Sequence, residues 1–204
     1  RSRITGWRTM EVRTIAFEGL DGSGKDTSIE KLALLIDCDI WNTPKETKQK
    51  RSEEAHKLGE TDELYEFFIR SYQSEWDEIG QRLSTLRPGQ VLLLNRCWVS
   101  AASYRSAETG EAPVWPRDFK PDVIFTIRVD EELRSKRLSI RPELKPRELR
   151  TLEDHDYREG QQRAEMELGC TPLRIRDREP EVVAMRALQH LLGVKGFTYI
   201  PRKE

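Results

Sequence analysis

The sequence predicts an α/β fold, in which a doubly wound parallel sheet of five strands is flanked by helices. Three observations support this. Strand-like segments alternate with helical periodicity along the whole chain. The continuous apolar run Val91-Leu92-Leu93-Leu94 is typical of a central parallel strand that is buried on both faces. A glycine-rich loop, residues 19–27, follows the first expected strand and precedes the first expected helix. Ligands of such folds bind at the carboxyl ends of the strands.

The individual elements follow from periodicity and from breaker residues. The expected strands span residues 12–17, 38–41, 91–94, 123–129 and 171–175. The expected helices span residues 28–36, 62–86, 99–108, 131–139, 152–168 and 181–192. Residues 141–150 contain two prolines, three arginines and a lysine with few apolar residues. We therefore expect an exposed, mobile basic segment there.

The length of 204 residues predicts a single domain over residues 12–193. Residues 1–11 are then an N-terminal extension or a remnant of an expression tag, and residues 194–204 a C-terminal tail. The net charge is −1 although 35% of the residues are charged, so acidic and basic side chains are interspersed. The protein therefore has no overall positive electrostatic field that would favour binding of nucleic acid. Three widely spaced cysteines without a C-x-x-C pair argue against a disulfide framework and a zinc site, which favours a cytoplasmic location. No apolar run is long enough for a membrane span, so a soluble protein is expected.

The glycine-rich loop fits the phosphate-binding pattern G-x-x-x-x-G-K, known as the P-loop, with aspartate where serine or threonine is usual. Its residues are Gly19, Leu20, Asp21, Gly22, Ser23, Gly24, Lys25, Asp26 and Thr27. In such a loop the backbone N–H groups, the helix N-terminus and the lysine ammonium converge on a polyphosphate. The alternative is a turn that only links strand to helix. The strand-turn-helix context favours nucleotide binding, and the whole loop is the candidate ATP site.

Several segments together resemble the thymidylate kinases, members of the nucleoside monophosphate kinase group of P-loop proteins. Residues 17–25 are similar to the family's opening motif, including a carboxylate inside the loop, here Asp21. Pro44-Lys45-Glu46 resembles the Arg-Glu-Pro loop near the acceptor phosphate. Residues 94–104 resemble the Asp-Arg-Tyr segment, and the basic stretch lies where the family has its lid, about residues 137–152. The resemblance implies ATP as donor, Mg²⁺, a nucleoside monophosphate acceptor and a homodimer.

The resemblance and the charges suggest Lys25, Arg96, Asp21 and Arg141 as catalytic residues. Phosphoryl transfer requires neutralisation of the charge on the phosphate oxygens, which lysine and arginine supply. Arg96 follows the apolar strand and suits the acceptor phosphate, whereas the alternative is a surface ion pair. Arg141, like Arg147 and Arg150, is either a lid arginine that closes over the phosphates or part of a solvated charge run.

Two departures from the family pattern fall on the expected metal site, which comprises Asp26, Asp21 and Asn95. P-loop enzymes usually place Ser or Thr after the lysine and an acid at the end of the neighbouring strand. Here the first position holds Asp26 and the second Asn95. One hypothesis is that the carboxylate has moved across the same site. The alternative is that Asp26 is only a helix N-terminal acid and that Thr27 or Asp21 serves the metal.

Other departures concern recognition of the acceptor base. The family presents F-x-x-x-R on its long helix. Counted from Phe67, the arginine position of this motif holds Ser71, and Arg70 lies one residue before it. Ala101 stands where relatives often carry a hydrogen-bonding side chain. The candidate acceptor-binding residues are Asp21, Lys45, Phe67, Phe68, Arg70, Arg96, Ser100 and Tyr104. Tyr104 either presses on the sugar 2′ position or is simply packed.

The leading interpretation is ATP-dependent phosphorylation of a (deoxy)nucleoside monophosphate, similar to dTMP, to the diphosphate. One alternative is a kinase for a nucleoside or another small acceptor on the same fold. The other is a nucleotide-binding regulatory protein with little catalysis, which the residues at 26 and 95 motivate.

Overall fold

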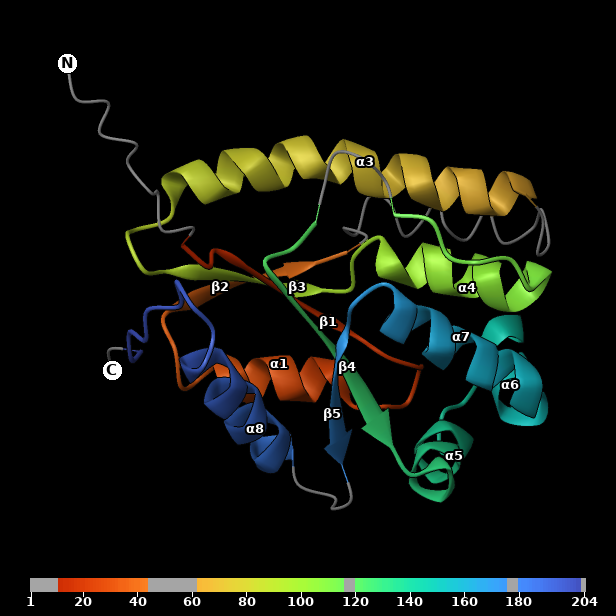
Figure 1. The fold of residues 1–204 in the computed structure, drawn as a ribbon. Coiled ribbons are helices and arrows are strands. Elements are labelled where there is room, and N and C mark those ends of the chain that lie inside the picture. The colour runs from red at the N-terminus through yellow and green to blue at the C-terminus, as the bar shows by residue number, and fades with distance from the viewer. Residues whose placement is uncertain (1–10, 44–61, 116–119, 176–179, 203–204) are drawn as a thin grey trace.

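The computed structural model describes residues 11–43, 62–115, 120–175 and 180–202. It confirms a five-stranded, entirely parallel sheet with the strand order β2-β3-β1-β4-β5 (Figure 1). The strands are β1 (Thr14–Glu18), β2 (Cys38–Asn42), β3 (Val91–Asn95), β4 (Val123–Val129) and β5 (Thr171–Ile175). Every residue of the central strand β1 is buried. The expected strands therefore agree with the observed ones to within two residues.

Helices cover both faces of the sheet, as a doubly wound fold requires (Figure 1). They are α1 (Lys25–Ala33), α3 (Asp62–Thr85), α4 (Val99–Thr109), α5 (Glu131–Ser139), α6 (Pro146–Glu153), α7 (His155–Glu167) and α8 (Pro180–Leu192). Ile15 and Phe17 of β1 share a buried cluster with α1 and α8. Ala16, whose side chain points to the opposite face, belongs to a cluster with α3 and α4. Two cores therefore lie on the two sides of one sheet.

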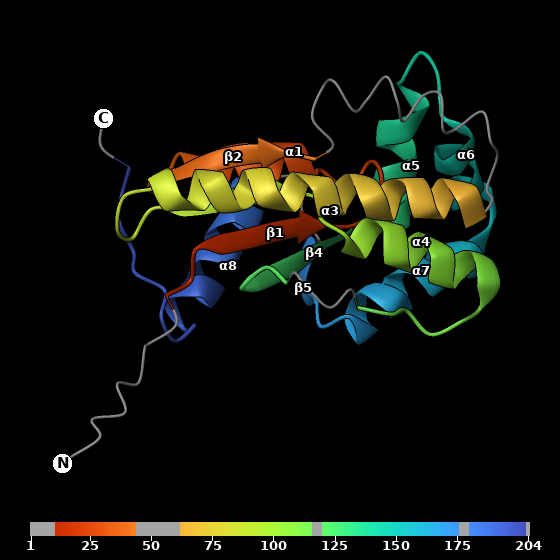
Figure 2. The ribbon, with the colours of Figure 1, turned by 90° about the horizontal axis from the view of Figure 1, so that it is seen from above.

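The carboxyl ends of the strands converge on one end of the molecule. The register pairs Phe17 with Asn95 and Glu18 with Thr126, so the last residues of β1 and β3 and the middle of β4 lie side by side. Figure 2 shows α4 to α7 gathered beyond the tip of β1. Side chains that follow β1 and β3 therefore meet the helices that complete the ligand-binding end.

The basic segment differs from the sequence prediction. Residues 146–153 form helix α6, in which Glu148 and Thr151 are buried, so the expectation of an exposed, mobile segment is wrong for this part. Residues 141–143 precede the helix and are exposed, as expected. Pro146 occupies the first turn, and the Glu148 carboxylate accepts a hydrogen bond from the Lys145 N–H at 2.9 Å. The expected helix over 152–168 is divided at Asp154, whose side chain caps α7 by accepting from the Tyr157 N–H at 2.9 Å.

Residues 194–202, which the sequence analysis assigns to a tail, contact the domain. Val194 and Phe197 pack against the core beneath α8. The Gly196 carbonyl accepts from the Val12 N–H at 3.0 Å, and the Ile200 carbonyl accepts from the Asp37 N–H at 2.8 Å. The packed unit thus extends beyond residue 193.

Cys38, Cys97 and Cys170 are all free thiols. In the described ranges, no helix combines the length and the apolar character that a bilayer span needs.

Candidate functional site

The P-loop connects β1 to α1 in the conformation that its glycines allow. Gly19 has φ 128°, and a Cβ there would approach the Ile127 carbonyl oxygen to 2.6 Å. Gly24 caps α1 in the left-handed region with φ 88°. A cavity of about 250 Å³ opens over this loop. Its lining comprises residues 21–28 of the loop and first helical turn, together with Arg137, Arg141 and Pro180. The loop therefore faces an open, cationic cavity rather than a packed turn.

Lys25 is buried in this cavity and donates to the carbonyl oxygens of Gly19 at 2.8 Å and Leu20 at 3.2 Å. Burial, with the nearby positive charge of Arg96, lowers the pKa of Lys25 to about 8, although Asp21 acts in the opposite direction. The lysine is cationic at neutral pH but much less basic than a solvated lysine.

Two arginines of α5, which the sequence analysis did not name as site residues, donate hydrogen bonds to carbonyl oxygens of the P-loop. Arg137 donates from Nη1 to the carbonyl oxygens of Gly22 and Ser23 at 3.3 and 3.2 Å. Arg134 is only 1% exposed, and its Nη1 donates to the Asp21 carbonyl oxygen at 3.2 Å. Both residues thus bind main-chain oxygens of the phosphate-binding loop.

Arg134 also ties the loop to α6 with its remaining donors. Its Nη1 reaches Thr151 Oγ1 at 3.2 Å and its Nη2 reaches the Thr151 carbonyl oxygen at 2.6 Å. Its Nε and Nη2 form a fork with the Glu131 carboxylate at 2.8 and 2.6 Å. All five guanidinium N–H groups are therefore used. Because the partners belong to the P-loop, α5 and α6, Arg134 fixes the position of α6 relative to the phosphate-binding loop.

Arg96 follows β3 and lies at the centre of a second cluster. It has φ 71°, in the left-handed region that is costly for a residue with a Cβ. Its Nη2 contacts Asp21 Oδ1 at 2.5 Å, and its Nη1 donates to Ser100 Oγ at 3.0 Å. Glu18 has no solvent exposure, and its carboxylate accepts from the Cys97 N–H at 2.7 Å and from the Ser100 hydroxyl at 2.6 Å. These contacts hold Arg96 in its strained conformation.

Asp21 links the two clusters. Burial raises the pKa of its carboxyl group, but Arg96, Lys25, Arg147 and Arg141 together outweigh burial and lower this pKa to about 2. Asp21 is therefore ionised at all physiological pH values.

Beyond Arg96 lies a second cavity of about 160 Å³, which we call the acceptor pocket. It is lined by Asp21, Phe68, Tyr72, Arg96, Ser100, Ala101, Tyr104 and residues 145–148. Asp21 also lines the P-loop cavity, so the two cavities meet at this carboxylate. The structure thus brings the P-loop together with Arg96, Ser100 and Tyr104.

On α3, the structure separates the candidate acceptor residues. Phe68 and Tyr72 line the acceptor pocket, whereas Phe67 and Arg70 line a different hollow along the helix. Arg70 is exposed, and its partner is Glu66 at 4.0 Å. The aromatic residues of α3 at the acceptor pocket are therefore Phe68 and Tyr72, whereas the step from Phe67 to Ser71 follows the other hollow. The candidate Lys45 lies outside the described residues.

The candidate metal residues Asp26 and Asn95 are in direct contact. The amide Nδ2 of Asn95 donates to Asp26 Oδ1 at 2.5 Å and to Asn42 Oδ1 at 3.1 Å. Asp26, like Thr27 and Asp21, also lines the P-loop cavity. Carboxylate and amide oxygens are ligands that suit a hard cation such as Mg²⁺, so this donor set fits the expected metal. Asn42, at the end of β2, is an addition to the predicted set.

The three arginines of the basic segment have three different environments. Arg141 lines the P-loop cavity and forms an ion pair with Glu148. Arg147 lines the acceptor pocket. Arg150 lines neither cavity; it forms an ion pair with Glu108, and its guanidinium lies 4.0 Å from the centre of the Tyr157 ring.

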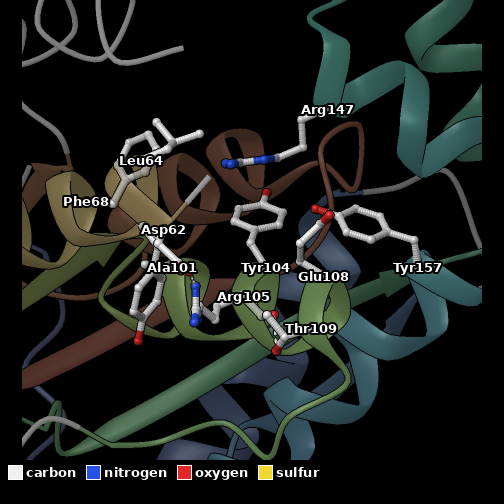
Figure 3. Close-up of a pocket in the computed structure, with 11 residues that line it drawn as sticks. Asp62, Leu64, Phe68, Ala101, Tyr104, Arg105, Glu108, Thr109, Arg147 and Tyr157 are labelled. Carbon is white, nitrogen blue, oxygen red and sulfur yellow. Dashed lines mark hydrogen bonds and ion pairs between the residues drawn. The ribbon is translucent and has the colours of Figure 1, made fainter. Parts of the chain in front are cut away.

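A third pocket adjoins the acceptor pocket and shares Phe68, Ala101, Tyr104 and Arg147 with it. Figure 3 shows Arg147 above the ring of Tyr104, with Phe68 on one side and Tyr157 on the other. The cation of Arg147 thus stands at the boundary between the two pockets.

Comparison with known proteins agrees with this geometry. The family model described as thymidylate kinase matches residues 17–169. The chain belongs to the thymidylate kinase family. It is accordingly an enzyme of the nucleoside monophosphate kinase class. No curated protein sequence matches the chain.

Solved structures of thymidylate kinases and of a deoxynucleoside kinase share the fold. The thymidylate kinase of Candida albicans is 17% identical, with a TM-score of 0.68 over 95% of this chain and 96% of that one. A deoxyadenosine kinase from M. mycoides, solved with dCMP and a flexible dCDP, is 13% identical, with a TM-score of 0.60 over 89% and 100%. The thymidylate kinase of Ehrlichia chaffeensis is 18% identical, with a TM-score of 0.58 over 90% and 100%.

Proposed function

We propose that this thymidylate kinase family member transfers the γ-phosphoryl group of ATP to the phosphate of a deoxynucleoside monophosphate similar to dTMP. The observation that carries the proposal is the meeting of two cavities at Asp21. One is lined by the P-loop with Lys25, and the other is lined by Arg96. A donor phosphate in the first and an acceptor phosphate in the second would face each other across Asp21.

The donor side supplies cations where charge accumulates during transfer. Lys25, Arg137 and Arg141 surround the P-loop cavity, and the N-terminus of α1 points into it. Phosphoryl transfer depends mainly on in-line positioning and on neutralising the charge of the β- and γ-oxygens. We assign Lys25 and Arg141 to this neutralisation, and Arg137 to positioning the loop that holds the phosphates.

The acceptor side positions the attacking phosphate. Arg96 presents a guanidinium fork whose orientation Asp21 and Ser100 fix. Asp21 stays ionised, so this orientation is independent of pH above about pH 4. The aromatic rings of Phe68 and Tyr104 line the same pocket and suit a base and a deoxyribose.

A magnesium ion fits the oxygen donors of Asp26, Asn95 and Asn42, with Asp21 nearby. When bound, such an ion neutralises the β- and γ-phosphate charge of ATP. The chain's own contribution is to hold these side chains together at the ends of β2 and β3 and the start of α1.

Helix α6 completes the site. Its first turn lines the acceptor pocket, and the Arg134 contacts to Thr151 anchor it to the P-loop. A helix in this place restricts the access of water to the transferring group, which would otherwise be hydrolysed.

The test is a panel of initial rates. ADP formation is measured with ATP and Mg²⁺ against the four deoxynucleoside monophosphates, their ribo counterparts and the free nucleosides, with Lys25→Ala as the blank. Turnover of monophosphates, with a deoxypyrimidine among the best acceptors, is the expected result. Turnover of nucleosides alone would overturn the assignment and favour the alternative of a nucleoside kinase.

Homodimerisation stays a prediction, as does a cytoplasmic location. The molecular mass measured by light scattering in solution tests whether the protein is a dimer.

A further inference from the structure

Arg147 is unlike the other cations of the site because aromatic rings surround its guanidinium. Its Cζ lies 4.0 Å from the centre of the Tyr104 ring and 5.7 Å from the centre of the Phe68 ring (Figure 3). The two rings come from α4 and α3, whereas Arg147 comes from the first turn of α6. Stacking on both rings restricts the orientation of the guanidinium plane.

The hydrogen-bonding capacity of Arg147 is not used up by the described part of the chain. Its Nε is shielded from solvent and has no hydrogen-bond partner there. Arg141 and Arg150, which lie six and three residues away, each form an ion pair with a carboxylate. A shielded donor without a protein partner favours a ligand group that accepts a hydrogen bond from it.

The location of Arg147 is fixed by the anchoring of α6. Thr151, one turn further along this helix, receives two hydrogen bonds from the buried Arg134. Glu148, next to Arg147, is buried and accepts from the Lys145 N–H. Arg147 is therefore presented to the acceptor pocket from a rigid element, and its position suits recognition of a ligand.

Arg147 also differs in its place along the pocket. The P-loop cavity is lined by Arg137 and Arg141, and the acceptor pocket is lined by Arg96. Arg147 lines the acceptor pocket and the adjoining third pocket but not the P-loop cavity. Arg96 lines only the first of these two pockets, so Arg147 extends the cationic lining from the Arg96–Asp21 pair toward the third pocket.

We propose that Arg147 is a specificity-determining residue that donates hydrogen bonds to the base of the acceptor nucleotide. A guanidinium has five donors and no acceptor, so it selects base edges with a ring carbonyl, as in thymine, cytosine and guanine. Adenine offers ring-nitrogen acceptors beside an exocyclic amine but no carbonyl oxygen, so it should bind more weakly. The residues of α3 that line the acceptor pocket, Phe68 and Tyr72, carry no cation, so the cation that reads the base comes from α6. This inference rests on the proposed function.

The test compares Arg147→Met and Arg147→Lys with the intact protein. Dissociation constants of dTMP, dCMP, dGMP and dAMP are measured by calorimetry, and kcat and KM are measured for the same acceptors. The intact protein should prefer one of the carbonyl-bearing bases to adenine. In Arg147→Met, the affinity for that base should fall about ten- to hundredfold, while the affinity for dAMP changes less than threefold. Lysine should restore little of the loss because it lacks the planar fork.

Arg150→Met is the matched control. Arg150 also lies on α6 and stacks on a tyrosine, but it lines neither cavity, so its removal should leave the base preference unchanged. Melting temperatures of all variants identify any that fail to fold. If Arg147→Met does not fold, the base preference of Arg147→Lys decides the matter.

Three results would overturn the inference. The first is a preference of the intact protein for dAMP. The second is an equal loss of affinity for all four monophosphates in Arg147→Met, which would indicate a contact with the phosphate or sugar. The third is a loss in kcat with unchanged KM and affinity. The proposed function fails separately if the intact protein binds monophosphates without phosphorylating them, because the dissociation constants still test the base preference.

Discussion

Replacing Arg134 with methionine removes the guanidinium that joins the P-loop to α6. Methionine keeps most of the aliphatic stem, which packs beneath Gly22, where a Cβ would come within 3.2 Å of Arg134 Cγ. The substitution therefore deletes five hydrogen bonds, two of which form the ion pair with Glu131, while leaving the apolar packing largely in place.

The expected loss follows from what the partners of Arg134 keep. Removing one member of a buried ion pair costs about 3–5 kcal/mol. Glu131 is 38% exposed and retains a contact with Arg158 at 3.5 Å, and the Thr151 carbonyl oxygen retains the Arg158 Nη1 at 2.9 Å. The Asp21 carbonyl oxygen and Thr151 Oγ1 each lose an accepted bond without a described replacement, but Thr151 Oγ1 still donates to the Glu148 carbonyl oxygen at 2.9 Å. The loss should therefore lie near the lower limit, about 3 kcal/mol, which lowers the melting temperature of a chain of this length by roughly 10 °C.

Urea denaturation of the intact protein, Arg134→Met and Arg137→Met measures this loss. Arg137 lies on the same helix and makes two hydrogen bonds within the described ranges, of 3.3 and 3.2 Å, so its removal should cost about 1 kcal/mol. A loss below about 1 kcal/mol for Arg134→Met, or one equal to that of Arg137→Met, would refute the role of Arg134 as the link between α6 and the P-loop.

Three further predictions concern charge. The first is a double-mutant cycle of Asp26→Ser and Asn95→Asp. Because the two side chains touch and would share the metal, the turnover of the double variant should be about tenfold higher than the two single effects multiplied together predict. Simple additivity of the two effects would contradict this. The second follows from burial and Arg96, which lower the pKa of Lys25 to about 8. As the pH rises through about 8, Lys25 loses its charge and the affinity for ATP should weaken, whereas the affinity of Lys25→Arg should stay level. An affinity of the intact protein that is level to about pH 9.5 would count against this. Burial raises the pKa of Glu165 to about 7 despite its bond with Thr126, so the folded state takes up a proton that the unfolded state lacks between about pH 4.5 and 7. Unfolding free energy should fall by about 3 kcal/mol across that window and then level off, and denaturation of Glu165→Gln at pH 5 and pH 8 should lack this component; an identical pH dependence would exclude it.

The sheet was predictable because its strands carry strong local signals. β3 is an uninterrupted apolar run, and β4 and β5 were predicted with their observed bounds. The P-loop was predictable because its spacing is specific and its context is strand-turn-helix. The position of Arg96 followed from the same logic, since a residue after a central parallel strand must lie at the carboxyl edge of the sheet.

Other parts of the site depend on contacts that no local pattern encodes. Phe67 and Phe68 are adjacent aromatic residues, and one residue turns a helix by about 100°, so periodicity alone did not decide which of them faces the pocket. Helix α6 was missed because it is buried through Glu148 and Thr151, which are polar, rather than through an apolar stripe. Arg134 looks like a solvent-exposed helix residue in the sequence, and only its tertiary partners explain its burial.

Product identification by mass spectrometry tests the central claim most directly. The enzyme is incubated with γ-labelled ATP, Mg²⁺ and a deoxynucleoside monophosphate, with Lys25→Ala as the blank. The proposed function predicts that the label appears in the deoxynucleoside diphosphate in equal amount to the ADP formed. Label in inorganic phosphate alone, or no ADP with any monophosphate, would contradict it.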